Sequence, residues 1–202
     1  MEVQRVVLAS GNAGKLREFS ELLAASGLVP VRQSDFGVVP PPETGGTFLE
    51  NALIKARNAA RITRLPAIAD DSGIEVDALG GAPGVYSARY AGEDASDADN
   101  LSKLLGALAG LPDAKRTARY RCVIVYVNQA EDSHPLIAAG TWEGRIIDAR
   151  RGSNGFGYDP SFVPAGDTRT VAEIPQDEKN LASHRGQAMR AFLAQLGART
   201  RP

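Results

Sequence analysis

Apolar residues at the start of the chain form short continuous runs that alternate with a helical stripe. The run Val6–Ala9 ends at the polar residues Ser10–Asn12, which predicts a buried strand followed by a turn. In Leu16–Leu23, apolar residues recur at the spacing of an amphipathic helix. A second short strand is predicted over Val29–Arg32. The first part of the chain is therefore predicted to form a strand, a helix and a strand.

The rest of the chain repeats this alternation of strands and helices. Thr47 and Glu50 have the spacing of a helix-capping box, and the apolar stripe that follows predicts a helix as far as Thr63. The short strand Pro66–Ala69 is predicted to break at the polar residues Asp70–Gly73. Further strands are predicted at 119–127 and 136–147, and further helices at 97–111 and 183–196. The pattern predicts an α/β fold with a mixed sheet.

Length and composition indicate one globular domain over residues 1–202. The 202 residues are 43% apolar and 23% charged, which is typical of a folded globular chain. The net charge of -1 provides no basic field for a nucleic-acid partner. With one cysteine, Cys122, and two histidines, neither an internal disulfide nor a zinc site is expected. The apolar run at Val6 is too short for a signal peptide or membrane span, so we expect a cytoplasmic protein without a membrane partner.

A candidate phosphate-binding turn lies between the first strand and the first helix. It comprises Ser10, Gly11, Asn12, Ala13, Gly14 and Lys15. Backbone N–H groups at a helix start favour an anion, and glycines allow close approach. The spacing differs from that of a Walker A loop, and Leu16 stands where that motif needs Ser or Thr. An ordinary strand-to-helix turn with an exposed lysine is the alternative.

Asp70 and Asp71 form a candidate magnesium site. They follow a predicted strand, and the ends of strands in open α/β sheets are where ligands collect. Mg²⁺ usually takes one or two carboxylates and completes its shell with water and substrate phosphates. Glu43 could add a further carboxylate, although a loop glutamate is more often only solvated. The alternative is a plain turn, because Asp, Ser and Gly are common turn residues.

Two further segments carry candidate recognition residues. Phe156 and Tyr158 lie in a glycine-rich loop, where a ring could stack on a base; both rings could instead fill the core. His184 and Arg185 stand in the first turn of the closing helix, where cationic side chains oppose the helix dipole. An anionic or functional partner would compensate them, and Lys179 could join the cluster. Surface pairing with acids is the alternative.

These segments together resemble a known family, that of the inosine triphosphate pyrophosphatases, which are non-canonical purine nucleotide pyrophosphatases. The resemblance runs in order from near residue 8 to near residue 190. It rests on six motifs: Ser10-Gly-Asn-x-x-Lys15, Phe48-x-Glu-Asn-Ala-x-x-Lys-Ala-Arg57, Ala69-Asp-Asp-Ser-Gly73, Gly80-Gly-Ala-Pro-Gly-Val-Tyr-Ser-Ala-Arg89, Gly155-Phe-Gly-Tyr-Asp-Pro160 and Ser183-His-Arg-Gly186.

The resemblance implies an elongated mixed β-sheet flanked by helices, with two lobes and a central active-site cleft, in a homodimer. It implies Mg²⁺-dependent hydrolysis of ITP, dITP and XTP to the monophosphate and pyrophosphate, which clears deaminated purines from the nucleotide pool. Asp71 would be the general base, and Asp70, Asp71 and Glu43 would surround the metal. The residues implied to contact substrate are Ser10, Gly11, Asn12, Ala13, Gly14, Lys15, Lys55, Ser72, Phe156, Gly157, Tyr158, Asp159, Lys179, His184 and Arg185.

Three other functions are compatible with parts of the sequence. A nucleotide sensor without catalysis would keep the turn and the aromatic loop, but it has no need of Asp70 and Asp71. A phosphotransferase is disfavoured because no Walker A or kinase loop is present. An RNA-binding module is disfavoured by the net charge of -1.

Overall fold

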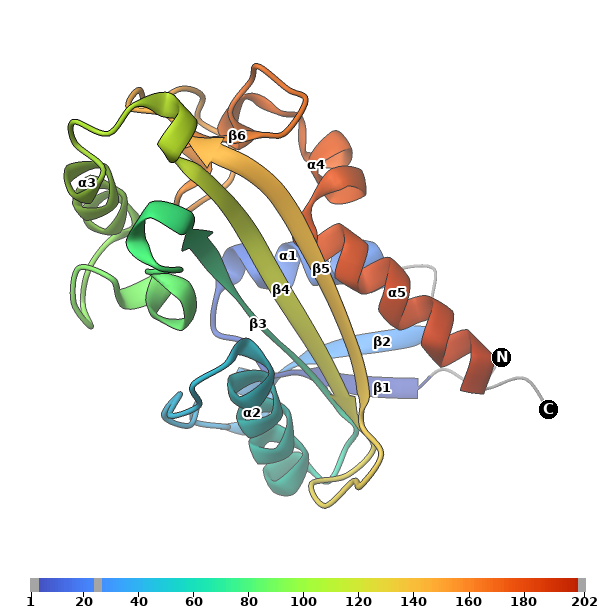
Figure 1. The fold of residues 1–202 in the computed structure, drawn as a ribbon. Helices are drawn as coiled ribbons and strands as arrows, with labels where there is room; N and C mark the ends of the chain where they lie inside the picture. The colour runs from blue at the N-terminus through green and yellow to red at the C-terminus, as the bar shows by residue number, and fades with distance from the viewer. Residues whose placement is uncertain (1–3, 24–26, 200–202) are drawn as a thin grey trace. The chain divides into compact units, whose positions relative to one another are not determined.

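The structure, a computed structural model, describes residues 4–23 and 27–199. Within these residues, six strands form one sheet in the order β2-β1-β3-β4-β5-β6 (Figure 1). The strands are β1 (Gln4–Leu8), β2 (Leu28–Arg32), β3 (Ala67–Val76), β4 (Thr117–Val127), β5 (Leu136–Ile146) and β6 (Phe162–Pro164). β1 runs parallel to β2 and β3, whereas β6 runs antiparallel to β5. The predicted α/β class and mixed sheet are therefore confirmed.

Four of the five helices in the described residues begin close to the predicted positions, and α4 (Gln176–Ala182) was not predicted. The other four are α1 (Ala13–Leu23), α2 (Phe48–Thr63), α3 (Asp97–Ala107) and α5 (His184–Arg199). The capping box of α2 is formed as predicted, since Thr47 and Glu50 each bond the other's backbone N–H. α3 ends four residues before the predicted Leu111, because Leu108 leaves the helical conformation and Gly110 has a positive φ of 77°. No helix among the described residues is long and apolar enough to cross a membrane.

The chain divides into two compact units. Unit 1 comprises Met1–Asp71, Cys122–Ala139 and Arg185–Pro202, and unit 2 comprises Ser72–Arg121 and Gly140–His184. The prediction of a single domain over residues 1–202 and that of a cleft between two lobes stay predictions.

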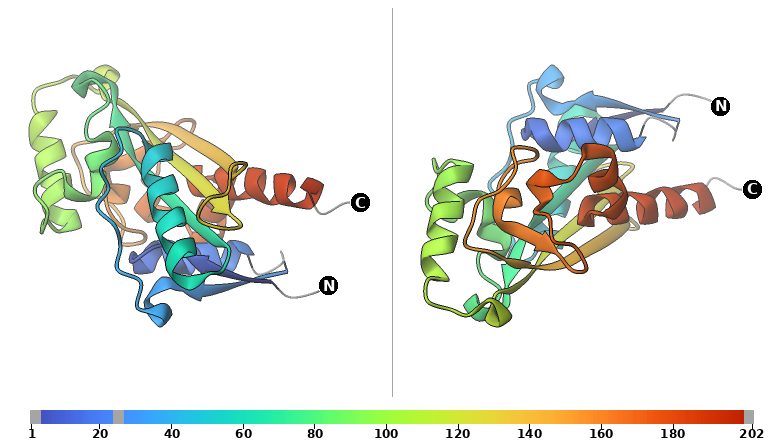
Figure 2. Two further views of the ribbon diagram at one scale, coloured as in Figure 1. Left: turned by 90° about the horizontal axis from the view of Figure 1, so that it is seen from below. Right: turned by 90° about the horizontal axis from the view of Figure 1, so that it is seen from above.

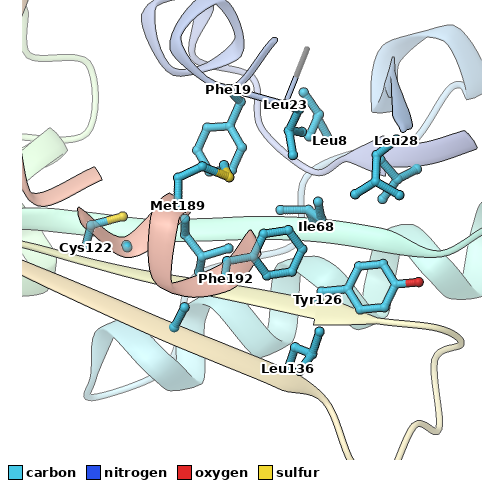
Figure 3. Packing of buried hydrophobic residues seen from close by; sticks show 14 residues of the cluster. Leu8, Phe19, Leu23, Leu28, Ile68, Cys122, Tyr126, Leu136, Met189 and Phe192 are labelled. Atoms are coloured by element: carbon cyan, nitrogen blue, oxygen red, sulfur yellow. The ribbon is translucent and has the colours of Figure 1, made fainter. Parts of the chain in front are cut away.

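Unit 1 has helices on both faces of its strands, because the side chains of β1 alternate between two cores. Val6 and Leu8 pack with α1 and α5, whereas Val7 and Ala9 pack with the alanine-rich face of α2. Figure 2 shows α2 in front when the molecule is seen from below, and α1 and α5 in front when it is seen from above. Figure 3 shows Phe19 of α1 and Met189 and Phe192 of α5 packed together over the strands. The helical stripes predicted to face inward in these two helices are confirmed.

Unit 2 has a separate core around α3. Leu101, Leu104 and Leu108 are buried there, and they belong to one cluster with Ile74 of β3 and Phe162 of β6. This core supports the glycine-rich loop at 155–159, because Tyr158 is buried in the same cluster.

The predicted break at Asp70–Gly73 is wrong, because β3 continues through these residues to Val76. Gly73 is required for close packing: a Cβ atom there would lie 2.4 Å from both the carbonyl oxygen of Gly84 and the Oγ of Ser87. Asp70 and Asp71 are tolerated in a buried strand because each has a cationic partner. Residues that usually mark a turn here lie within a strand.

Candidate active site

The turn between β1 and α1 directs Lys15 toward β3. Asn12 caps α1, because its Oδ1 accepts a hydrogen bond of 3.0 Å from the Lys15 backbone N–H. The Oγ of Ser10 accepts from the Asn12 N–H at 3.2 Å. Lys15 then places its Nζ 2.9 Å from Oδ2 of Asp70. The predicted turn and the predicted carboxylates thus meet at one ion pair.

The other residues of this turn are packed less closely. Gly11 is exposed, and a Cβ atom added to it would meet no other atom within 4 Å. Gly14 is half-buried in the first turn of α1. Ala13 begins α1, but its side chain lies outside the described parts of the chain.

Asp70 lies on the face of β3 that is covered by α1 and α5. Besides Lys15, its Oδ2 has NH2 of Arg185 at 3.5 Å, and the carboxylate is only 3% exposed. Burial by itself would raise the pKa of Asp70, but the charges of Lys15 and Arg185 together hold it well below its usual range. Asp70 is therefore a permanent anion at neutral pH.

Arg185 is anchored on the same face by a residue that the sequence interpretation missed. Its NH1 pairs with Oε2 of Glu18, and both side chains are buried. The sequence offered one signal for Glu18: it stands three residues after Lys15, so the two share a face of α1. Arg185 thus lies between two carboxylates in unit 1, with its pKa raised by Asp70 and Glu18 against the opposing effect of burial.

Asp71 lies on the opposite face of β3, on the side of α2. Its Oδ1 is 2.9 Å from Nζ of Lys55, and its Oδ2 accepts a hydrogen bond of 3.3 Å from Nδ2 of Asn51. The same Lys55 Nζ is 2.9 Å from Oε1 of Glu43. Burial, and to a smaller extent the charge of Glu43, raises the pKa of Asp71 against the opposing charges of Lys55 and Lys15. A buried carboxylate with a raised pKa suits a general base.

Glu43 and Asp71 fit a divalent cation better than the full predicted set of three carboxylates does. The Lys55 ammonium already lies between them, so the pair accepts a positive charge, and carboxylate oxygens are the donors that Mg²⁺ prefers. Asp70 faces the other side of the strand. Within residues 4–23 and 27–199, no group of three or more His, Cys, Asp or Glu side chains is arranged to hold a metal ion.

In unit 2, Asp159 organises the glycine-rich loop. Its Oδ1 accepts from the Tyr120 hydroxyl at 2.9 Å, and its Oδ2 accepts from Nζ of Lys179 and from the Phe156 backbone N–H, each at 3.0 Å. A Cβ atom at Gly155 would lie 2.0 Å from Oδ2 of Asp159, so glycine is required there. Asp159, predicted to contact substrate, has both carboxylate oxygens bonded within the protein.

The remaining predicted residues of unit 2 surround this loop. Lys179 is buried and places Nζ 5.0 Å from the ring centroid of the half-buried Phe156. The Tyr158 hydroxyl donates to the carbonyl of Ser87 at 2.8 Å. The Gly157 N–H donates to Oδ2 of Asp97 at 2.8 Å. The loop is thus fixed on several sides.

His184 and Ser72 also belong to unit 2. The His184 ring is stacked on Tyr120 with centroids 4.7 Å apart and an interplanar angle of 10°. Ser72 is half-buried on β3. His184 and Arg185 are adjacent in sequence; His184 stacks on an aromatic ring, and Arg185 pairs with two carboxylates.

Comparison with known proteins identifies one family that this chain matches over nearly its whole length. The sequence model of the Ham1 family matches residues 6–195. A dITP/XTP pyrophosphatase of Shigella flexneri is 56% identical over 194 residues, covering 96% of this chain and 98% of that protein. A dITP/XTP pyrophosphatase of Methylococcus capsulatus is 56% identical over 197 residues and covers 98% of each chain. A solved structure of a HAM1 protein from Coxiella burnetii has a TM-score of 0.90 and 48% identity, covering 96% of this chain and 99% of that one.

Proposed function

Because this chain belongs to the Ham1 family, we propose that it hydrolyses ITP, dITP and XTP to the monophosphate and pyrophosphate. The relatives named above are called dITP/XTP pyrophosphatases and align over nearly the whole chain. The family resemblance of the six sequence motifs is confirmed by these matches. The observation that carries the proposal is the buried Asp71 carboxylate, held by Lys55 and Asn51 beside Glu43.

Asp71 is the general base in this proposal. It takes a proton from the water that attacks the α-phosphorus, and the bond from that phosphorus to the bridging oxygen breaks, releasing pyrophosphate. Its raised pKa, caused first by burial, makes it a stronger base than an ordinary carboxylate. Phosphoryl transfer depends mainly on positioning and charge neutralisation, which a fixed carboxylate and nearby lysines provide.

Lys15 and Lys55 bind the phosphates in this proposal. In the structure each ammonium is paired with a carboxylate, so phosphate oxygens would compete with Asp70 and Asp71 for these cations. Ser10, Gly11, Asn12, Ala13 and Gly14 contribute the turn that leads to Lys15. Because Lys15 and Arg185 hold Asp70 ionised, we assign Asp70 to the positioning of Lys15.

The charge of this cluster favours a requirement for Mg²⁺. Three cations, Lys15, Lys55 and Arg185, face the four carboxylates of Glu18, Glu43, Asp70 and Asp71. A cluster with excess negative charge repels a triphosphate unless another cation is bound. Glu43 and Asp71 would hold that ion, which when bound would supply charge neutralisation for the phosphates.

The glycine-rich loop and the residues around it recognise the base in this proposal. A ring such as Phe156 can stack on any base, so stacking gives affinity without selection. Selection for a 6-oxo purine requires hydrogen-bond donors toward the C6 oxygen, and we assign that role to the surroundings of Lys179 and His184. With adenine, each such buried donor would lose its partner at a cost of about 1–3 kcal/mol. GTP shares the C6 oxygen and is expected to be rejected less strongly.

The test is a panel of nucleotides with Mg²⁺, with pyrophosphate and orthophosphate resolved in the products. ITP, dITP and XTP should give the monophosphate and pyrophosphate, and ATP should react more slowly by a factor on the order of 10² to 10⁴. Orthophosphate and a diphosphate as first products would refute the proposed position of attack. Nucleotide binding without turnover would indicate a sensor.

Three properties outside the active site stay predictions. We expect a homodimer, a cytoplasmic location and no nucleic-acid partner. The last two rest on the single cysteine and the net charge of -1.

A further inference from the structure

Asn51 makes two contacts that connect separate parts of unit 1. It is fully buried, with 0% of its surface exposed, in the first turns of α2. Its Nδ2 donates to Oδ2 of Asp71 at 3.3 Å, and its Oδ1 accepts from the backbone N–H of Gly45 at 2.8 Å. One amide therefore bonds both β3 and the loop that carries Glu43.

The preceding residue of α2 completes the attachment of this loop. Oε2 of Glu50 accepts from the backbone N–H groups of Gly46 at 2.8 Å and of Thr47 at 3.0 Å. Glu50 and Asn51 together thus bind three consecutive N–H groups, starting two residues after Glu43. Glu50 is exposed, whereas Asn51 is buried against Asp71.

The fit at Gly45 shows how closely the loop approaches. A Cβ atom on Gly45 would lie 2.7 Å from Oδ1 of Asn51 and 2.6 Å from Cβ of Glu50. The φ of Gly45 is not in the left-handed region, so glycine is needed here for space. The backbone of the loop is therefore in direct contact with the Asn51 amide.

We propose that Asn51 is a positioning residue that holds Asp71 and the Glu43 loop at a fixed separation, so that the two carboxylates can share one divalent cation. This inference rests on the proposed function. An asparagine suits the task because its amide offers a donor to a carboxylate and an acceptor to a backbone N–H at the same time. Isosteric leucine offers neither, and aspartate offers no donor.

Lys55 shows that the present separation of Glu43 and Asp71 lets one cation contact both carboxylates. Its Nζ is 2.9 Å from both Oε1 of Glu43 and Oδ1 of Asp71, so one cation already reaches both carboxylates. If the loop moved away from β3, a single cation could contact only one of them. Partners of metal-binding carboxylates commonly change metal affinity or activity 10- to 100-fold when they are removed.

The experiment compares Asn51→Leu with Glu50→Ala as the matched control. Asn51→Leu removes both contacts at nearly constant volume. Glu50→Ala removes the two neighbouring loop anchors, keeps the Thr47 cap of α2 and does not touch Asp71. Mn²⁺ binding to the nucleotide-free protein is measured by electron paramagnetic resonance, and kcat and KM for ITP are measured at saturating Mg²⁺. Asn51→Ser is made in parallel, because leucine at a fully buried polar site can prevent folding.

We expect Asn51→Leu to weaken Mn²⁺ binding about tenfold and to lower kcat about 10²-fold, with KM changed much less. Glu50→Ala should keep both quantities within about threefold of the unmodified protein, since Asp71 keeps its amide partner. Equal effects of the two substitutions would overturn the inference, because they would assign Asn51 to loop anchoring alone. Unchanged Mn²⁺ affinity and kcat in a less stable Asn51 variant would overturn it too.

The proposed function is tested separately by the unmodified protein. If that protein releases no pyrophosphate from ITP, the proposed function fails. The Mn²⁺ measurement then decides on Asn51 by itself: tenfold weaker binding in the Asn51 variants supports the inference, and unchanged binding overturns it.

Discussion

Asp70 and Asp71 are adjacent on β3, yet their carboxylates lie on opposite faces of the strand and pair with different lysines. Asp70 pairs with Lys15 of α1, and Asp71 pairs with Lys55 of α2, each at 2.9 Å. The pKa of Asp70 is lowered and that of Asp71 is raised. Strand alternation has thus given two neighbouring carboxylates opposite properties.

Asp71→Asn should abolish most of the turnover of ITP while leaving the fold intact. The substitution removes the proposed base and one of the two carboxylates assigned to the metal, and each role is worth ~10²-fold or more. The measurement is the steady-state rate of pyrophosphate release, with a circular dichroism melt as the control for folding. Turnover near that of the unmodified protein would indicate that another residue is the general base.

Asp70→Asn should lower the free energy of unfolding in a pH-dependent manner. Because the pKa of Asp70 is lower in the folded state, its ionised form stabilises the fold above the unfolded pKa of about 3.9, and this stability is lost as the pH falls through the folded pKa. The difference from the unmodified protein should be on the order of 2 kcal/mol at pH 6 and should shrink below about pH 4. Urea unfolding at several pH values measures it, and a difference that does not change with pH would contradict the ion-pair assignment.

Lys15→Ala should weaken the binding of all nucleoside triphosphates alike. An ammonium that contacts phosphates carries no information about the base, so the ratio of kcat/KM for ITP and ATP should not change. KM values for ITP, XTP and ATP provide the measurement. A changed ratio would show that Lys15 contributes to base selection.

Arg185→Ala should destabilise the protein more than Lys15→Ala does. Removal of the buried guanidinium leaves Glu18 and Asp70 without one of their cations, and breaking a buried pair costs about 3–5 kcal/mol. From the sequence, we also expect the ratio of kcat/KM for ITP to that for ATP to fall more in this variant than in Lys15→Ala. If kcat/KM falls equally for ITP and ATP while the free energy of unfolding falls as stated, Arg185 acts on the phosphates or stabilises the fold.

Cys122 should not react with thiol reagents in the folded protein. Its side chain is 1% exposed, and burial, aided by the charge of Asp70, raises the pKa of the thiol to about 12. At pH 8 the reaction with a chromogenic disulfide should be at least about 10³-fold slower than in urea, because so little thiolate is present. Rapid labelling of the native protein would show that β4 opens near Asp70.

Most elements of the fold could be predicted because their signals are local. The apolar run at Val6, the capping box at Thr47 and the stripe that includes Phe192 each depend on residues within one turn or strand. Two short elements, β6 and α4, were not predicted, since three and seven residues carry little periodicity. The continuation of β3 was missed because the tolerance of Asp70 and Asp71 in a strand depends on Lys15 and Lys55, which come from other elements.

The site residues stay predictions, but the structure shows an arrangement among them that the sequence did not predict. The motifs include Lys15 and Asp71, and Glu43 was a separate candidate from the loop before Thr47. The contacts of Glu18 and Asn51 follow from burial and pairing that no local pattern encodes. The different partners of His184 and Arg185 could not be predicted either, because Tyr120 and Glu18 lie far away in the sequence.

The order in which the units are built during synthesis follows from the way the chain passes between them. Both segments of unit 2 end by His184, whereas α5 supplies Met189 and Phe192 to the core of unit 1 only afterwards. On a ribosome, unit 2 is therefore fully translated while unit 1, although begun first, still lacks a helix of its core. Until α5 emerges, the face of β1 and β3 that packs with α1 and α5 is covered by α1 alone, so this interval leaves apolar surface of unit 1 exposed.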